Sequence, residues 1–376
     1  MAKSSTKKTV VKSKKKLISA ASYQFLTNYI NNPSPVGFET SGQKIWLEYL
    51  TKYVDTTYTD AYGTAVGVIN PNAPFKVVIE AHADEISWFV NYINDQGLIY
   101  LKRNGGVDHQ IAPSMRVWIH GKKGPVKAVF GWPAIHTRLS NPEQKEPQPK
   151  VDNLTLDCGA RSKKEVEALG IHIGAVVTYQ EGIDELANDF IIGRAFDNRV
   201  GGFMIAEVAR LLKENKKKLP FGLYIVNAVQ EEIGLRGAEM IARRIKPNIA
   251  IITDVTHDTH TPMINKAIEG DIQCGKGPSL AYAPAIHNKL LAIVEETAKN
   301  KKIPVQFRTL SRSTGTDTDA FAYSNGGVAS ALISLPLRYM HTTVEMVQKN
   351  DVENVIKLIY ETLLTIKEGE DFNYFE

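Results

Sequence analysis

Residues 190–254 read FIIGRAFDNRVGGFMIAEVARLLKENKKKLPFGLYIVNAVQEEIGLRGAEMIARRIKPNIAIITD. Short apolar runs alternate here with two helical patterns, in the order 190–192, 200–212, 223–229, 237–245 and 249–252. Strands that are separated by helices belong to crossover units, and such units build sheets whose strands run parallel and whose two faces are covered. The stretch therefore predicts an α/β fold with a mostly parallel central sheet covered by helices.

The N-terminal part of the chain fits the same fold class. Helical patterns at 20–30 and 42–53 are separated by Asn32-Pro33-Ser34-Pro35, where proline removes a backbone donor and ends the first helix. The runs at 64–69 and 75–80 are rich in β-branched residues and predict two strands. These elements precede the quoted stretch, and we expect them to join the same sheet.

Residues 90–182 have a different texture. Short strand-like pieces, such as those at 98–101 and 115–120, are separated by glycine, proline and lysine. This pattern is typical of a small barrel or sandwich. We therefore predict an inserted small β-barrel domain at 90–182, which interrupts one α/β domain made of residues 17–89 and 183–376.

Composition and charge limit the class of protein. The chain has 376 residues, 43% of them hydrophobic, which is enough for two domains. Its net charge of +4 comes from seven lysines within residues 1–16, because the rest has 38 basic and 41 acidic residues. We interpret residues 1–16 as a disordered basic tail and expect no nucleic-acid partner.

Targeting signals and cysteine motifs are weak in this sequence. The N-terminus lacks the apolar stretch of a secretory signal, and no run of about 18 apolar residues predicts a membrane span. Two cysteines are too few for a disulfide framework and have no zinc-type spacing. We therefore expect a cytoplasmic protein with no membrane partner and with Cys158 and Cys274 as plain thiols.

Side chains of the kind that bind metals follow the predicted strands. Five separate segments each end an apolar run in such residues, namely His82 with Asp84, Asp197, Glu231 with Glu232, Asp254 and His341. In open α/β sheets the carboxyl ends of the strands form the crevice where ligands bind. Two imidazoles and several carboxylates are the ligands that zinc and similar divalent ions prefer. The segments therefore predict a metal site at one edge of the sheet.

A pair of divalent ions bridged by a carboxylate can activate a water for hydrolysis, but a base must take its proton. Of the adjacent Glu231 and Glu232, one can bind metal while the other stays free, since consecutive residues leaving a strand point in different directions. Taken singly, an acid after a strand is more often a turn residue or helix cap. His257 and His260 also look like ligands, but we interpret them as loop or supporting groups because neither ends a predicted strand.

Six stretches, taken together and in order, resemble a known enzyme family, the co-catalytic metallo-aminopeptidases that include the glutamyl and the tetrahedral (TET) aminopeptidases. The stretches are 81–86, 193–201, 230–238, 254–256, 315–317 and 338–342. The resemblance covers residues 20–368 and implies a phosphorylase/hydrolase-like catalytic peptidase domain at 17–89 and 183–376. It also implies the inserted β-barrel domain.

The resemblance assigns roles that spacing alone leaves open. It implies that Asp197 bridges two divalent ions, zinc or cobalt. It further implies that His82 and Glu232 complete one metal site, and that Asp254 and His341 complete the other.

The resemblance also implies the catalytic pair. Glu231 would be the general base and then the proton donor to the leaving amine, and Asp84 would hydrogen-bond His82 and fix its tautomer. The peptide bond Asp197–Asn198 is expected to be cis, as is common in the family. Members assemble from dimers into hollow dodecamers, so we expect a homo-oligomer.

The sequence thus predicts a two-metal aminopeptidase that acts on short peptides. Two alternatives stay open: a two-metal deacylase or carboxypeptidase, and a metal-binding scaffold that has lost catalysis. Paired carboxylates also occur in glycoside hydrolases, but two histidine ligands argue against that class. The loop at 275–284 and the β-barrel could line a specificity pocket, yet no residue there identifies the preferred substrate.

Overall fold

The computed structural model describes residues 17–139, 146–180 and 182–375, so the predicted basic tail lies outside the described residues. Its largest element is an eight-stranded sheet. In spatial order the strands are β1 (Thr56–Thr59), β2 (Ala65–Ile69), β12 (Gly222–Ala228), β3 (Lys76–His82), β13 (Ile249–His257), β16 (Ala329–Leu337), β14 (Ser279–Tyr282) and β15 (Gln306–Thr309).

The middle of this sheet is parallel and its edges are mixed. Strands β12, β3, β13 and β16 run parallel to one another. Strand β2 is antiparallel to β1 and to β12, and β14 is antiparallel to β16. Only residues 60–64 link β1 to β2, too few for the crossover that a parallel pair needs. The predicted α/β class is confirmed, with a sheet that is mixed at its edges.

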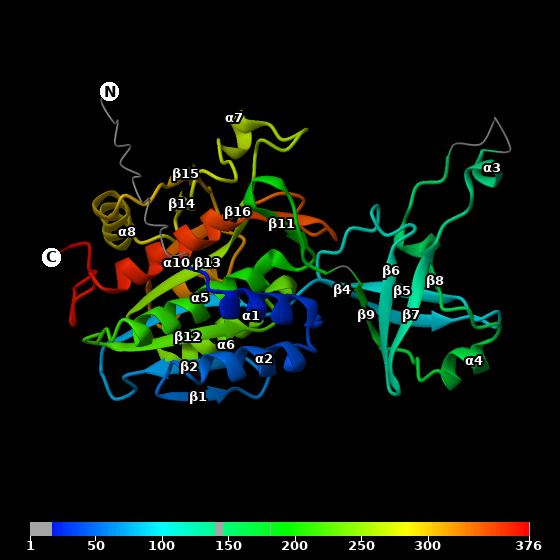
Figure 1. The fold of residues 1–376 in the computed structure, drawn as a ribbon, viewed down its shortest axis with the longest axis horizontal. Helices are drawn as coiled ribbons and strands as arrows, with labels where there is room; N and C mark the ends of the chain where they lie inside the picture. Colours follow the sequence, from blue (N-terminus) through cyan, green and yellow to red (C-terminus); the bar gives the residue numbers. More distant parts are fainter. Residues whose placement is uncertain (1–16, 140–145, 181, 376) are drawn as a thin grey trace, which may run out of the picture.

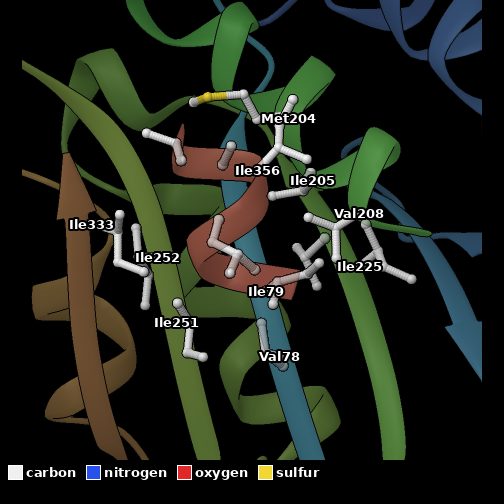
Figure 2. Close-up of a cluster of buried hydrophobic side chains, with 14 of the residues drawn as sticks. Val78, Ile79, Met204, Ile205, Val208, Ile225, Ile251, Ile252, Ile333 and Ile356 are labelled. Atoms are coloured by element: carbon white, nitrogen blue, oxygen red, sulfur yellow. The ribbon is translucent and has the colours of Figure 1, made fainter. Parts of the chain in front are cut away.

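Helices cover both faces of the sheet (Figure 1). One face carries α1 (Ala20–Asn31), α2 (Thr40–Leu50), α5 (Phe196–Glu214), α8 (Asn288–Lys301) and α10 (Lys349–Leu363). The other face carries α6 (Arg236–Ile245) and α9 (Thr318–Ala322), which pack on each other and on β12, β13 and β16. Figure 2 shows Met204, Ile205 and Val208 of α5 in one cluster with Ile79 of β3 and Ile356 of α10. The sheet is therefore the centre of the larger core.

Two glycines allow α5 to lie close to the sheet. A Cβ atom at Gly201 would lie 2.8 Å from the Ala81 Cβ, and one at Gly202 would lie 2.7 Å from the Asn227 Oδ1. Both distances are too short for real side chains, so glycine permits this approach. The approach brings Asp197, in the first turn of α5, to the end of β3, where its Oδ1 lies 3.2 Å from the His82 Nε2.

The run 190–192 lies in a different sheet from the one predicted. Strand β11 (Phe190–Gly193) pairs antiparallel with β10 (Asp184–Glu185) and β17 (Glu345–Gln348) in a separate three-stranded sheet. The prediction that this run joins the central parallel sheet was wrong, because the apolar pattern identifies a buried strand but not its partner. The register sets Gly193 opposite Glu345.

The inserted segment forms a closed barrel, as predicted, and Figure 1 shows it set apart from the central sheet. In spatial order its strands are β4 (Ser87–Ile93), β5 (Ile99–Asn104), β8 (Thr155–Asp157), β7 (Gly124–Gly131), β6 (Arg116–Gly121) and β9 (Val176–Tyr179). A separate apolar core, which includes Trp88 and Phe130, fills it. Full closure leaves no unpaired strand edge.

The remaining elements are short. They are α3 (Ile135–Arg138), α4 (Lys163–Ala168), α7 (Lys266–Glu269) and the 3₁₀ helices η1 (Val151–Asn153), η2 (Ala187–Asp189) and η3 (Glu231–Ile233). Within the described ranges, no helix has the length and apolar character needed to cross a membrane. Cys158 and Cys274 are free thiols, as predicted.

Candidate active site

All the predicted metal-type side chains but Asp84 line one cavity of about 220 Å³ at the carboxyl edge of the parallel strands. His82 is the last residue of β3, and Glu231 and Glu232 begin η3 directly after β12. Asp254 lies within β13, which continues to His257 rather than ending at Asp254. The register sets Glu80 opposite Ile252, so His82 and Asp254 fall level on the same face two residues further along.

The loops supply the other two candidate ligands. Asp197 lies in the first turn of α5, and His341 lies in the turn between β16 and β17. Ala195, Gln230 and His341 have φ values of 58°, 59° and 61°. A non-glycine residue in this left-handed region is uncommon and often belongs to a functional site. The peptide bond Asp197–Asn198 is cis, which confirms the prediction.

Asp197 stands between two groups of ligand atoms. Its Oδ1 lies 3.2 Å from the His82 Nε2, which is 3.9 Å from the Asp254 Oδ1. Its Oδ2 lies 3.3 Å from the His341 Nε2, which is 3.2 Å from the Glu232 Oε1. The two candidate metal groups are therefore His82, Asp197 and Asp254, and Asp197, Glu232 and His341.

This geometry groups the candidate ligands differently from the pairing implied by the resemblance. Asp254 falls with His82, and His341 falls with Glu232, whereas the expected pairing joined Asp254 to His341. The reason is that β3 and β13 are adjacent parallel strands whose register sets His82, the last residue of β3, level with Asp254 within β13. Glu231 belongs to neither group that shares Asp197, although its Oε2 approaches the His82 Nε2 to 3.9 Å and it forms a third group with His82 and Glu232. Of the four carboxylates that line the cavity, Glu231 is therefore the one that neither of these two groups uses as a ligand.

Two further carboxylates, Asp84 and Glu345, accept hydrogen bonds from the backbone of the cavity-lining residues. Asp84 is fully buried and accepts hydrogen bonds from the backbone N–H groups of Glu231 at 3.0 Å and Glu232 at 3.1 Å. Its Oδ1 also lies 3.4 Å from the His82 Nδ1, but the predicted hydrogen bond between them is not formed, because this nitrogen has no hydrogen-bond partner. One carboxylate thus orients two neighbouring acids and faces a histidine, as groups around metal ligands commonly do.

Glu345 makes equivalent contacts on the other side of the site, and no sequence motif pointed to it. It is buried and accepts from the N–H groups of Asp197 at 3.0 Å and His341 at 2.8 Å. The pairing of β11 with β17 sets Glu345 beside this segment. A glutamate in a short strand is not informative alone, so only the pairing of two distant segments reveals its contacts.

The electrostatics of the cavity fit divalent cations. Burial alone would lower the pKa of His341, but the carboxylates of Asp197 and Glu232 raise it to about 11. Burial raises the pKa of Asp254 to about 7, and burial with the Asp317 and Asp254 carboxylates raises that of Glu231 to about 10, although His82 opposes this. Carboxylates this crowded and desolvated resist ionisation unless cations neutralise them. The donor set therefore fits hard or borderline metal ions.

Other side chains complete the cavity wall. Thr256, Arg308, Thr314, Thr316 and Met340 line it together with the acids, and sequence reasoning identified none of them individually. Gly315 and Thr316 belong to the resembling stretch 315–317, which gave a partial signal.

His257 and His260, the other two histidines considered as ligands, have different positions. His257 ends β13 and lines the cavity, so the expectation that it does not end a strand was wrong. The apolar run stops at 252, and the polar end of the strand carries no periodic signal. His260 lies outside the cavity lining and contacts Asp271 at 2.8 Å and Lys266 at 2.7 Å.

Most of the sequence matches a known family. A family model described as M42 glutamyl aminopeptidase matches residues 63–358. The chain belongs to this family. Among its relatives, the lysyl aminopeptidase of Pyrococcus furiosus is 32% identical over 92% of this chain and 97% of its own length. The glutamyl aminopeptidase of Lactococcus lactis subsp. cremoris is 30% identical over 81% of this chain and 84% of its own length.

Solved structures of similar proteins agree in fold. A TET aminopeptidase from a marine sediment Thaumarchaeota archaeon has a TM-score of 0.88 at 27% identity and covers 93% of this chain and 97% of its own. An aminopeptidase of Desulfurococcus kamchatkensis has a TM-score of 0.84 at 29% identity over 92% and 96% of the two chains. Family, relatives and site together make this chain a metal-dependent aminopeptidase.

Proposed function

We propose that this aminopeptidase holds two divalent ions, zinc or cobalt, with Asp197 as the bridging ligand. The observation that carries the proposal is that the two Asp197 oxygens face different histidines, at 3.2 and 3.3 Å. His82 and Asp254 would complete one site, and Glu232 and His341 the other. Imidazole nitrogens and carboxylate oxygens are suitable ligands for both ions.

When bound, a pair of divalent ions lowers the pKa of a water and polarises the carbonyl that is attacked. The protein must still move a proton. Glu231 is the residue for this step because it lies beside both groups without belonging to either pair that shares Asp197. It would take the proton of the water and pass it to the leaving amine. Asp84 would keep Glu231 in place through its backbone N–H.

The substrate is proposed to be a short peptide with a free amino end. A cavity of about 220 Å³ admits roughly one residue beside the catalytic groups, which suits removal of single residues. No observation favours a deacylase or carboxypeptidase, and hydrolysis of aminoacyl-anilides rather than acyl-amino acids distinguishes these reactions. A catalytically silent scaffold is disfavoured because every candidate ligand and Glu231 line the same cavity.

Glu231→Gln tests the assignment of the base. The variant keeps the size of the side chain and the ligands around it, so it should bind metal normally. Turnover of an aminoacyl-anilide should fall by about two to four orders of magnitude, the range for loss of general acid–base help. Glu296→Gln, on the exposed side of α8, is the matched control and should be unaffected. Near-normal turnover by metal-loaded Glu231→Gln would refute the assignment.

We also propose that the protein is a homo-oligomer. A Pyrococcus horikoshii TET1 peptidase, with a TM-score of 0.81 and 23% identity, can assemble into a tetrahedron or a large octahedral shell. Light scattering of the purified protein tests this, and a strict monomer would exclude it. The cytoplasmic location expected from the sequence stays a prediction.

A further inference from the structure

Arg308 is a cation in the candidate active site that the catalytic chemistry does not use. It lies on β15, at the edge of the central sheet, and lines the same cavity as Glu231 and Asp254. Its Nη1 donates to the Thr256 Oγ1, and its Nη2 lies 3.4 Å from the Ser334 Oγ. Its Nε is buried and has no hydrogen-bond partner. The two hydroxyl contacts therefore position the guanidinium, and its Nε–H still lacks a hydrogen-bond acceptor.

No carboxylate in the described part of the chain forms an ion pair with Arg308, and the nearby charges do not neutralise it. Burial lowers the pKa of Arg308, and Asp254 and Glu269 oppose this from a distance. An arginine nevertheless stays charged in proteins. Glu269 is exposed on α7, and Asp254 belongs to a proposed metal group. A half-buried cation without a partner is costly unless a ligand supplies the anion.

The carboxylates of the cavity would not supply that anion once two divalent ions were bound. With two divalent ions bound, their four positive charges balance the four carboxylates of the cavity, which are Asp197, Glu231, Glu232 and Asp254. None of these four lining carboxylates would then be left to pair with Arg308. Two other polar residues, Thr314 and Thr316, line the same cavity, and their hydroxyls are hydrogen-bonded to each other at 2.9 Å.

We propose that Arg308 binds the side-chain carboxylate of an acidic residue, glutamate or aspartate, at the amino end of the substrate. The inference rests on the proposed function. Arg308 and the catalytic groups share a cavity of about 220 Å³, so the substrate group that reaches Arg308 belongs to the residue that carries the scissile carbonyl. A guanidinium forms strong, directional hydrogen bonds with a carboxylate, and it repels a lysine side chain.

Family membership does not fix this preference. The relatives described above include a lysyl aminopeptidase at 32% identity and a glutamyl aminopeptidase at 30% identity. We therefore infer the preference of this chain for an acidic or a basic N-terminal residue of the substrate from the charge of Arg308 in its cavity.

The test compares kcat/KM for glutamyl-, glutaminyl-, lysyl- and leucyl-anilides. Glutamate and glutamine have nearly the same shape, so their ratio isolates the charge. The wild type should prefer glutamyl over glutaminyl by about 10- to 150-fold, the range for a hydrogen bond to a charged group. Arg308→Gln should remove most of this ratio through KM, Arg308→Lys should keep part of it, and Arg308→Glu should favour lysyl. Arg312→Gln, exposed and outside the cavity lining, is the control.

A binding measurement gives a readout that does not depend on turnover. In calorimetric titrations, the zinc-loaded Glu231→Gln variant should bind L-glutamate more tightly than L-glutamine and L-lysine. The double variant that carries both Glu231→Gln and Arg308→Gln should not show this difference in affinity. The inference is overturned if wild type cleaves leucyl- or lysyl-anilide with no preference for glutamyl over glutaminyl. If no anilide is cleaved, the proposed function fails, and the titration still decides whether Arg308 selects an acidic side chain.

Discussion

Glu345→Gln tests whether a residue that touches no proposed metal still controls the metal site. The Glu345 carboxylate accepts the N–H groups of Asp197 at 3.0 Å and of His341 at 2.8 Å, and its side chain is 2% exposed. Glutamine retains one acceptor oxygen and presents an amide group to the second N–H. One buried N–H should therefore lose its partner.

The expected cost has two parts. An unsatisfied buried N–H destabilises the fold by about 1–3 kcal/mol. Because the two N–H groups belong to proposed metal ligands, the ligands should also lose orientation, and groups that orient ligands typically change metal affinity by about 10- to 100-fold. The first effect is measured by urea unfolding in the presence of chelator. The second is measured by titrating zinc into the metal-free protein.

Asp351→Asn is the matched control for Glu345→Gln. Asp351 is equally buried and also accepts two backbone N–H groups, from Gly275 and Gly277, but it lies outside the cavity lining. It should lose similar stability and keep full zinc affinity. If both variants lose stability equally and zinc affinity is unchanged in both, Glu345 is only a structural residue and the reasoning is wrong.

Two further predictions follow from the same geometry. Asp84→Asn should lower turnover about 10- to 100-fold, because it weakens the hold on Glu231, Glu232 and the adjacent histidine. It should also destabilise the fold by about 1–3 kcal/mol, as argued for Glu345→Gln, because one buried N–H loses its acceptor. An unchanged kcat would remove Asp84 from a positioning role. Zinc affinity should fall as the pH falls through 7. Asp254 has a pKa of about 7 and His341 a pKa of about 11 in the metal-free protein, so both residues bind protons at low pH. They must release these protons to bind metal. Titration in two buffers of different ionisation enthalpy should therefore give different apparent enthalpies, and identical values would contradict the prediction.

Several features could be predicted because their signals are local. Apolar runs, helical spacing and turn residues identify strands and helices one segment at a time. The polar residues that end these runs identified His82, Asp197, Glu232, Asp254 and His341 as candidate ligands, and the structure brings all five to one cavity. The change in texture after residue 90 identified the barrel.

Other features depend on which segments become neighbours. The run at 190–192 is a strand, as predicted, but β11 pairs with β17 instead of joining the central sheet. The same pairing gives Glu345 its contacts with Asp197 and His341.

The sequence by itself thus determined the chemistry available to this protein, because each candidate ligand follows a locally recognisable apolar run. The tertiary structure alone decided how Asp197 divides the ligands into two groups and that the cation of Arg308 faces the same cavity. The physical reason is that charge balance and ligand grouping are properties of distances between side chains. Asp197 and His341 are 144 positions apart in the chain and 3.3 Å apart in space, and no local pattern encodes such a distance.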